Sequence, residues 1–255
     1  MPSHYRNNTK AGNCYKDFPE LYDILYARYL RSIPDFVKLV ENNTPPRGAI
    51  LDIAAGTGEV TIPLLKQGYH VTALDVHGGM LKELEQKAAR QKLRNYSLMH
   101  KNMSALAGHG QFDTVCIRQA INYLPSARAL KNGFAKMYAA LKPGGALVFN
   151  APNFTIATKH YPPVHSLYEK DGLSAFVLET NALRKRTLTH RQNAILWSMD
   201  RAPHYITDAN IFYMYTKDEF ADALTVAGFR KITFLASGLT NYDKKSKTLY
   251  CVAKK

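Results

Sequence analysis

An apolar run that leads directly into a glycine turn constrains this chain more than any other feature. Residues 48–53 read as a buried strand, and Gly56 and Gly58 stand in the turn that opens the next helix. Glycine has no Cβ, so it adopts backbone conformations closed to other residues and lets a ligand approach the main chain closely. The pattern predicts a strand, a turn and a helix that present bare backbone to a ligand.

Acidic residues end the first two predicted strands. Asp52 lies at the end of the first strand, and Asp75 closes the next apolar run, residues 69–75. In an open α/β sheet, ligands bind outside the carboxyl ends of the strands. We therefore expect both carboxylates to face one crevice, where Asp75 is suited to the two hydroxyls of a ribose.

Three segments follow one another in an order typical of one enzyme family. Residues 52–58 read DIAAGTG, residues 112–117 form another apolar strand pattern, and residues 141–149 read LKPGGALVF. They resemble the first motif, the fourth strand and the fifth-strand turn of the class I S-adenosylmethionine (SAM)-dependent methyltransferases. The resemblance covers about residues 48–150 and resumes near residue 216.

This resemblance implies a fold and a cofactor. The expected fold is α/β, with a Rossmann-like, seven-stranded, mostly parallel sheet, helices on both faces, N-terminal helices and an inserted lid after strand five. We expect a single domain over residues 1–255, with its core at about 48–150 and 216–255, an N-terminal helical cap at 15–44 and a substrate lid at 151–215. SAM would be the cofactor, and S-adenosyl-L-homocysteine would be the product.

A nicotinamide dinucleotide site is the main alternative for such a glycine turn. That site needs a third glycine so that helix and strand pack closely around a pyrophosphate. Thr61 stands at that position. The sequence therefore favours SAM, which carries no phosphate. A glycine turn that merely reverses the chain is the other alternative.

Hydrophobic periodicity predicts the elements outside the core. Aromatic and apolar residues between Phe18 and Tyr29 recur at helical spacing, which predicts one helix there. Thr216 and Glu219 form the pattern of a capping box at the start of a late helix, which Gly228 would end.

The segment 151–215 does not follow the alternation of strands and helices. It is rich in Tyr, His and Pro and contains strand-like stretches at 194–199 and 211–215. Loops at the carboxyl edge of such a sheet carry function. We expect a small β-lid packed over the pocket.

Candidate site residues come from the strand ends, the N-terminal segment and the lid. The expected cofactor-binding residues are Asp52, Ala54, Gly56, Gly58, Asp75, Val76, Met80, Asn102, Met103 and Arg118. The expected substrate-binding residues are Tyr26, Gln119, Tyr161, Trp197 and Tyr213. The alternatives are that Arg118 and Gln119 lie in a salt bridge outside the pocket and that the tyrosines pack in the core.

Methyl transfer from a sulfonium depends mainly on aligning two reactants. An acceptor that starts protonated also needs a base, for which histidine is the usual candidate. Of the lid histidines, His160, His165, His190 and His204, the first two follow strand five most closely. We predict that His160 or His165 is the base, with Tyr22 as a phenol near the methyl group. The alternative is that each of these residues packs or lies at the surface.

Composition indicates which kinds of partner and which cellular compartment to expect. The formal net charge is +14, which would favour an acidic partner such as nucleic acid, a nucleotide-linked sugar or a carboxylate, or would reflect a solvated basic surface. No apolar run approaches the roughly 20 residues that span a bilayer, and the start lacks a secretory signal. We expect a cytoplasmic protein with no membrane partner. The cysteines Cys14, Cys116 and Cys251 are expected to be reduced thiols rather than metal ligands.

Two kinds of methyltransferase remain, and the sequence does not specify the oligomeric state of either. A small-molecule N- or O-methyltransferase is favoured by the aromatic lid and by residues 22–26, YDILY, which resemble an element that covers the cofactor in such enzymes. An RNA or protein methyltransferase is favoured by the charge, but residues 118–124 replace the N/D-P-P-Y/F/W motif that holds a flipped base. A non-catalytic SAM-binding protein is a third alternative, because methyl transfer requires no obligatory side chain.

Overall fold

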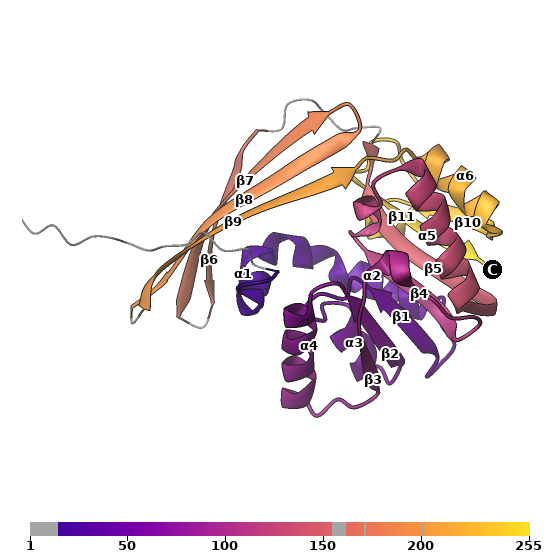
Figure 1. Cartoon of the computed structure of the whole chain (residues 1–255), viewed down its shortest axis with the longest axis horizontal. Coiled ribbons are helices and arrows are strands. Elements are labelled where there is room, and N and C mark those ends of the chain that lie inside the picture. The colour runs from indigo at the N-terminus through magenta and orange to yellow at the C-terminus, as the bar shows by residue number, and fades with distance from the viewer. Residues whose placement is uncertain (1–14, 155–161, 171, 200) are drawn as a thin grey trace, which may run out of the picture.

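A seven-stranded sheet forms the centre of the molecule, in the order β10-β11-β5-β4-β1-β2-β3 (Figure 1). The computed structural model describes residues 15–154, 162–170, 172–199 and 201–255. The strands of this sheet are β1 (Ala49–Ile53), β2 (His70–Asp75), β3 (Tyr96–His100), β4 (Phe112–Arg118), β5 (Leu141–Pro152), β10 (Arg230–Leu235) and β11 (Thr248–Lys254). Strands β1 to β5 are parallel, and β11 lies antiparallel between β5 and β10. The predicted Rossmann-like α/β sheet is confirmed.

Helices cover both faces of this sheet because its central strands are apolar on both sides. Leu51 and Val115 belong to a core shared with α5 and α6, whereas Ile50 and Cys116 belong to a core shared with α2 and α3. The helices are α2 (Ile33–Glu41), α3 (Thr61–Lys66), α4 (Gly78–Arg90), α5 (Ala127–Ala140) and α6 (Lys217–Ala227). Each helix therefore buries one stripe, and the strand ends between the two layers stay available for a site.

The predicted capping box begins α6. Thr216 Oγ1 accepts a hydrogen bond from the Glu219 backbone N–H at 3.2 Å, and Glu219 Oε2 accepts one from the Thr216 N–H at 2.8 Å. Gly228 ends the helix at φ 103°, a left-handed conformation that glycine adopts without a Cβ penalty. These local signals are sufficient to set both ends of the helix.

The prediction of one continuous helix between Phe18 and Tyr29 is wrong. The segment forms a 3₁₀ turn (Pro19–Leu21), the short helix α1 (Tyr22–Leu25) and a second 3₁₀ stretch (Ala27–Ser32). Two carbonyls that would extend an α-helix accept side-chain donors instead: Gln192 Nε2 donates to Leu25 O at 3.1 Å, and Arg118 Nη2 donates to Tyr29 O. Tertiary hydrogen bonds therefore override the helical periodicity.

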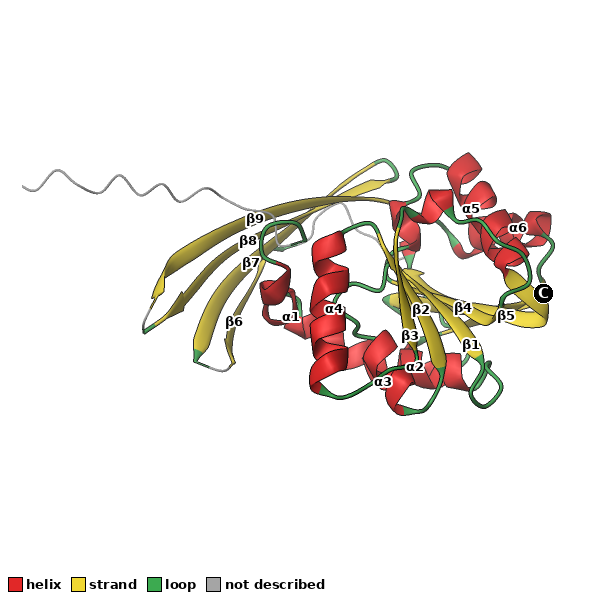
Figure 2. Ribbon diagram, turned by 60° about the horizontal axis from the view of Figure 1, so that its bottom comes forward, coloured by secondary structure: helices red, strands yellow, loops and turns green. Residues whose placement is uncertain are grey.

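The inserted segment forms a four-stranded antiparallel sheet, which we call the lid sheet. Its strands are β6 (Val164–Lys170), β7 (Leu173–Arg184), β8 (Thr187–Ser198) and β9 (Arg201–Tyr213), in that order across the sheet. It is larger than the small β-lid predicted, and Met214 and Tyr215 lie beyond the end of β9 rather than within a strand. Figure 2 shows the lid sheet extending away from the central sheet, with α1 between the two.

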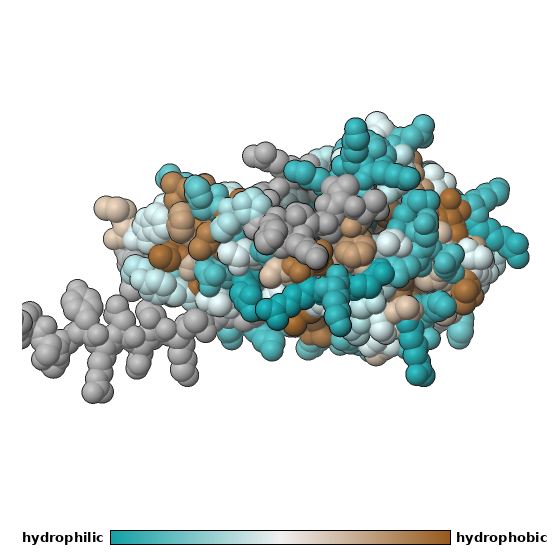
Figure 3. Space-filling view, turned by 90° about the horizontal axis from the view of Figure 1, so that it is seen from above, coloured by the Kyte–Doolittle hydropathy of each residue, from teal (hydrophilic) through white to brown (hydrophobic). Residues whose placement is uncertain are grey.

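The two faces of the lid sheet differ in character. The inner face packs Val177, Leu196 and Ile206 against Leu25 and its neighbours in the N-terminal segment. The outer face carries an exposed apolar row across all four strands, and hydrophobic side chains are visible among hydrophilic ones at the left of Figure 3. The members of this row are Leu167, Phe176, Ile195 and Tyr205.

Two cysteines lie within the described residues. Cys116 and Cys251 are buried free thiols, and burial raises the pKa of both well above its usual range. This agrees with the predicted reduced state, and Cys14 lies outside the described residues. Among the helices of the described part of the chain, none is long and apolar enough to cross a membrane.

Gly58→Ala should destabilise the fold more than Gly68→Ala. Both glycines have positive φ (91° and 85°), where an added Cβ costs about 1–2 kcal/mol. At Gly58 a Cβ would also lie 2.9 Å from Leu84 Cγ, whereas at Gly68 it meets nothing within 4 Å. Overpacking should add about 1–3 kcal/mol to the loss at Gly58. Urea unfolding of the two variants measures the difference, and equal losses would contradict the packing role.

Candidate functional site

One cavity of about 980 Å³ lies at the carboxyl ends of the parallel strands. Its floor comes from the loops after β1, β2 and β4, one wall comes from the N-terminal segment, and another comes from the lid sheet. This volume is at the upper end of the range for small-molecule and cofactor sites. The cavity is therefore large enough for a cofactor together with a second small molecule.

The glycine loop and the end of β2 are joined through one carboxylate. Gly56 N donates to Asp75 Oδ2 at 2.9 Å, and His77 N donates to Asp75 Oδ1 at 2.8 Å. Gly56 has φ 56°, and the nearest atom to an added Cβ would be Met80 Cε at 3.6 Å. Each carboxylate oxygen can accept more than one hydrogen bond, so both Asp75 oxygens retain capacity toward hydroxyls in the cavity.

Asp52 lies at the base of the same loop and is almost completely buried. Its Oδ2 accepts a hydrogen bond from Thr61 Oγ1 at 2.6 Å, and its Oδ1 lies 3.6 Å from the Cys116 thiol. Burial raises the pKa of Asp52 to about 7, although both hydrogen bonds act to lower it. Asp52 therefore supports the loop as well as lining the cavity.

A buried ion pair links β4 to the N-terminal wall. Arg118 Nη1 lies 2.7 Å from Glu59 Oε2, and both side chains are largely buried. Arg118 Nη2 also donates to Tyr29 O and to Ser32 Oγ. Burial raises the pKa of Glu59, and the guanidinium of Arg118 opposes that rise. Arg118 thus both lines the cavity and fastens the N-terminal segment over it.

A second link joins the N-terminal segment to the glycine loop. Thr57 Oγ1 donates to Asp23 Oδ1 at 2.6 Å, and Lys87 Nζ of α4 pairs with Asp23 Oδ2. Asp23 lies within the YDILY element, whose two tyrosines line the cavity. One side of α1 is thereby held over the loop.

Aromatic rings form the N-terminal wall. The rings of Tyr22 and Tyr26 stack with centroids 4.6 Å apart, and Tyr15 stacks on His77 at 5.6 Å. Burial raises the pKa of Tyr22 well above its usual value, and the nearby Glu59 acts in the same direction. Tyr22 therefore stays a neutral phenol near neutral pH and can donate a hydrogen bond but cannot serve as a base.

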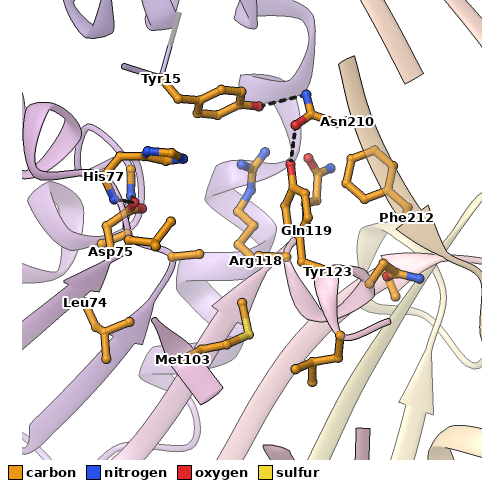
Figure 4. Close-up of a pocket in the computed structure, with 18 of the residues that line it drawn as sticks. Tyr15, Leu74, Asp75, His77, Met103, Arg118, Gln119, Tyr123, Asn210 and Phe212 are labelled. Carbon is orange, nitrogen blue, oxygen red and sulfur yellow. Dashed lines mark hydrogen bonds between the residues drawn. The ribbon is translucent and has the colours of Figure 1, made fainter. Parts of the chain in front are cut away.

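The lid sheet contributes a polar wall. Asn210 of β9 bridges two elements: its Nδ2 donates to Tyr15 Oη at 3.4 Å, and its Oδ1 accepts from Tyr123 Oη at 3.0 Å (Figure 4). On the adjacent strands, His190 Nδ1 lies 3.0 Å from Asn181 Oδ1. These residues face the cavity opposite the strand ends.

The predicted site residues divide into three groups. Those that line the cavity are Tyr22, Tyr26, Asp52, Ala54, Gly56, Asp75, Val76, Met80, Asn102, Met103, Arg118 and Gln119. Those that do not line it are Gly58, His165, Trp197 and Tyr213. His160 and Tyr161 lie outside the described residues.

Each residue of the second group has a position that explains its absence. Gly58 packs against Leu84 beneath the loop. His165 stacks on Phe176 on the lid sheet, with ring centroids 6.2 Å apart, and is exposed. Trp197 lines a small separate hollow, and Tyr213 packs on Tyr215. The positions of His165, Trp197 and Tyr213 therefore do not support the catalytic and substrate-binding roles predicted for them.

Other cavity residues were not singled out from the sequence. Examples are Tyr15, Glu59, His77, Tyr123, Asn181, Asn210 and Phe212, and His190 is a lid histidine that was not predicted to be the base. For His77, proximity to Asp75 is a usable signal. For Asn181, His190 and Asn210 the signal is strand alternation, but the registers that place them in one row arise only in the folded sheet.

Comparison with known proteins connects this arrangement to an enzyme class. Residues 50–145 match the model of a methyltransferase domain family. The chain is 33% identical over 218 residues to YqeM of Bacillus subtilis, which is classed as a methyltransferase, covering 85% of this chain and 86% of that protein.

Two solved structures share the fold. A SAM-dependent methyltransferase from Clostridium acetobutylicum gives a TM-score of 0.77 at 22% identity, covering 95% of this chain and 99% of that one. The sugar N-methyltransferase KedS8 from Streptoalloteichus gives a TM-score of 0.79 at 17% identity, covering 100% of this chain and 99% of that one.

The Asp52→Asn variant should gain stability over the wild type as pH rises. Asp52 has a pKa of about 7 in the fold against 3.8 ordinarily, so the wild type loses stability between about pH 4 and pH 7. The variant carries no charge there and keeps an oxygen for Thr61. The difference in unfolding free energy should grow by about 1–3 kcal/mol between roughly pH 5 and pH 8. Urea unfolding at the two pH values measures it.

Asp113→Asn provides the matched control for this measurement. Hydrogen bonds from Lys142 and the Ala49 N–H outweigh burial and lower the pKa of Asp113. Its carboxylate is thus ionised in both folded and unfolded states above about pH 5, and the variant's stability difference should stay constant. A constant difference for Asp52→Asn as well would contradict the raised pKa.

Proposed function

Since this chain belongs to the class I SAM-dependent methyltransferases, we propose that it transfers a methyl group from SAM to a nitrogen or oxygen atom of a small polar metabolite. The proposed class of substrate, a small polar metabolite, rests on one observation: the cavity is covered. The N-terminal segment and the lid sheet lie over the strand ends, so an acceptor must fit within about 980 Å³ together with the cofactor.

The cavity residues fit SAM chemically. Asp75 would accept hydrogen bonds from the ribose hydroxyls. The backbone N–H groups of Gly56 and His77 hold its carboxylate in place, and each oxygen can accept a further hydrogen bond. Val76 and Met80 offer apolar surface for the adenine, and Asn102 and Met103 would meet its edge. Asp52, Ala54, Gly56 and Arg118 would border the methionine end. When bound, SAM supplies an electrophilic methyl group on a sulfonium.

The remaining lining supports a polar acceptor. Besides Tyr26 and Gln119, amide side chains line the cavity at Asn122, Asn132, Asn181 and Asn210. Amides and phenols both donate and accept hydrogen bonds, which suits hydroxyl and amine groups. Lys101, Lys136 and Lys247 also line the cavity and would suit an acidic group on the substrate. The sugar N-methyltransferase activity named for KedS8 is in keeping with such a substrate.

The chain's own contribution to the reaction is alignment. Arg118 and Asp23 fasten the N-terminal wall over the loop, so this wall keeps a fixed position beside the reactants. Tyr22 remains a hydrogen-bond donor that can orient the acceptor. Holding two reactants in a near-attack geometry supplies much of the rate in a displacement of this kind.

An RNA or protein methyltransferase is the second candidate, because of the +14 charge. A bulky acceptor would have to extend a base or a side chain into the cavity between the N-terminal segment and the lid sheet. A protein that binds SAM without catalysis is the third candidate.

Asp75→Ala should weaken SAM binding about ten- to a hundred-fold. Loss of hydrogen bonds to a charged group costs about 1.5–3 kcal/mol, which corresponds to that change in Kd. Calorimetric titration with SAM and with S-adenosyl-L-homocysteine measures it, after thermal unfolding has shown that the variant is folded. Asp113→Asn, at the opposite edge of the sheet, should bind as the wild type does. Unchanged affinity in Asp75→Ala would contradict the ribose contact.

Methyl transfer from isotopically labelled SAM should appear in small molecules rather than in RNA or protein. The test divides a cell extract by ultrafiltration into a small-molecule filtrate and a macromolecular retentate, and incubates each with the enzyme. Labelled product in the filtrate supports the proposal. Label in the retentate that falls steeply as the salt concentration rises supports RNA as the methyl acceptor, because nucleic-acid binding releases counterions and therefore weakens with salt. Label in neither fraction, with SAM bound, would support a non-catalytic protein.

A further inference from the structure

We propose that His190, held by Asn181, accepts the proton that the acceptor releases during methyl transfer. This inference rests on the proposed function and assigns a base to the same site. It places the base on the lid sheet, but not at the histidines nearest to β5 in the sequence.

His190 lines the cavity but is only 5% exposed, and its Nε2 is buried. It lies on β8 between Asn181 of β7 and Asn210 of β9, which are its direct cross-strand partners. Asn210 is hydrogen-bonded to Tyr123, which follows the end of β4. The imidazole therefore belongs to the part of the lid sheet that is connected across the cavity to the strand ends.

The contact with Asn181 selects one tautomer of His190. Nδ1 lies 3.0 Å from Asn181 Oδ1, and an amide oxygen can only accept a hydrogen bond. Nδ1 must therefore carry the hydrogen, which leaves Nε2 as the basic nitrogen of the neutral ring. Asn181 acts as a positioning residue because it sets both the tautomer and the ring orientation.

The three carboxylates that line the cavity in the described part of the chain have different tasks. Asp75 accepts two backbone amides, Glu59 is paired with Arg118, and Asp52 is bonded to Thr61. Among the cavity-lining residues that the structure describes, the two histidines are His77 and His190.

His77 belongs to the cofactor side of the cavity. It follows Asp75 by two residues and stacks on Tyr15. Burial lowers its pKa. His190 is therefore the better placed of the two to meet an acceptor under the lid sheet.

Several ionisable groups lie near His190 on the lid sheet and on the elements that face it. Glu179 and Asp208 occupy the neighbouring cross-strand row on the same face of the lid sheet, on either side of Gln192. Tyr15 and Tyr123 approach from the N-terminal segment and the loop after β4 through Asn210. A general base acts in its unprotonated form, so the wild-type rate should rise with pH.

The bonds, electrons and proton of the proposed step balance. A new bond forms between the acceptor's nitrogen or oxygen and the methyl carbon, the sulfur–methyl bond breaks with its electrons returning to sulfur, and the acceptor's N–H or O–H proton moves to His190 Nε2. His190 then carries the proton and a positive charge until it passes the proton to a water molecule.

The first experiment measures transfer into the small-molecule filtrate for His190→Gln, Asn181→Leu, Asn181→Asp and His165→Gln. A general base contributes about 10²–10⁴ in rate, so His190→Gln should lower kcat by at least about a hundred-fold and lose the rise of rate with pH. SAM affinity, measured by calorimetry, should stay within about two-fold of the wild type. His165→Gln, which alters an exposed histidine outside the cavity lining, should keep the wild-type rate.

The two Asn181 variants separate positioning from simple packing. Asn181→Asp keeps an oxygen acceptor for Nδ1–H and adds a negative charge, so it should retain transfer with the rise of rate shifted to higher pH. Asn181→Leu removes the acceptor and should lose rate without loss of stability or SAM binding. Equal rates for Asn181→Asp and Asn181→Leu would overturn the role of Asn181.

The second experiment is independent of turnover. Long-range ¹H–¹⁵N spectra of histidine-labelled protein report which ring nitrogen is protonated, and the His190 signals are those lost in His190→Gln. The neutral ring should carry its hydrogen on Nδ1, and this preference should disappear in Asn181→Leu. A ring protonated on Nε2, or an unchanged rate and pH profile in His190→Gln, would overturn the inference. Absence of label in every fraction for the wild type would instead remove the proposed function itself.

Discussion

The hydrogen bond between Gly56 N and Asp75 Oδ2 is the contact on which the rest of the site depends. It joins the loop after β1 to the end of β2, so the carboxyl ends of two neighbouring parallel strands form one continuous surface of the cavity. The same carboxylate also accepts the His77 N–H, which fixes the start of the chain that leads into α4. A backbone donor is available there because Gly56 adopts a positive φ without steric cost. The chain's own hydrogen bonds thus hold the loop after β1 and the end of β2 in one arrangement.

The second layer of the site is held over this edge by charge and by side-chain hydrogen bonds. Arg118 and Asp23 fasten the N-terminal segment to β4, the glycine loop and α4. Gln192 fastens the lid sheet to the same segment through Leu25 O. These buried polar contacts interrupt what would otherwise be a regular helix, and in return they enclose a cavity between two sheets. Replacing Arg118 with an uncharged residue would leave Glu59 as a buried charge without its ion-pair partner.

The strand-end half of the cavity could be predicted from the sequence because its signals are local. A strand, its terminal acid and the following glycine turn occupy consecutive positions, so Asp52, Gly56 and Asp75 could be placed at one edge without knowing the tertiary fold. The acceptor half could not be predicted in the same way. His165 and His190 are both lid histidines, and which of them faces the cavity depends on strand alternation and register.

The sequence by itself determined the parallel core, the capping of α6 and the acidic strand ends that line the cavity, because periodicity, caps and turns act over a few residues. Tertiary structure alone decided that the N-terminal segment breaks into short turns, since donors from Gln192 and Arg118 arrive from distant strands. It also decided that Asn181, His190 and Asn210 form one row over the cavity. Long-range pairing sets those neighbours, and a one-residue slip in register would turn each of them to the opposite face.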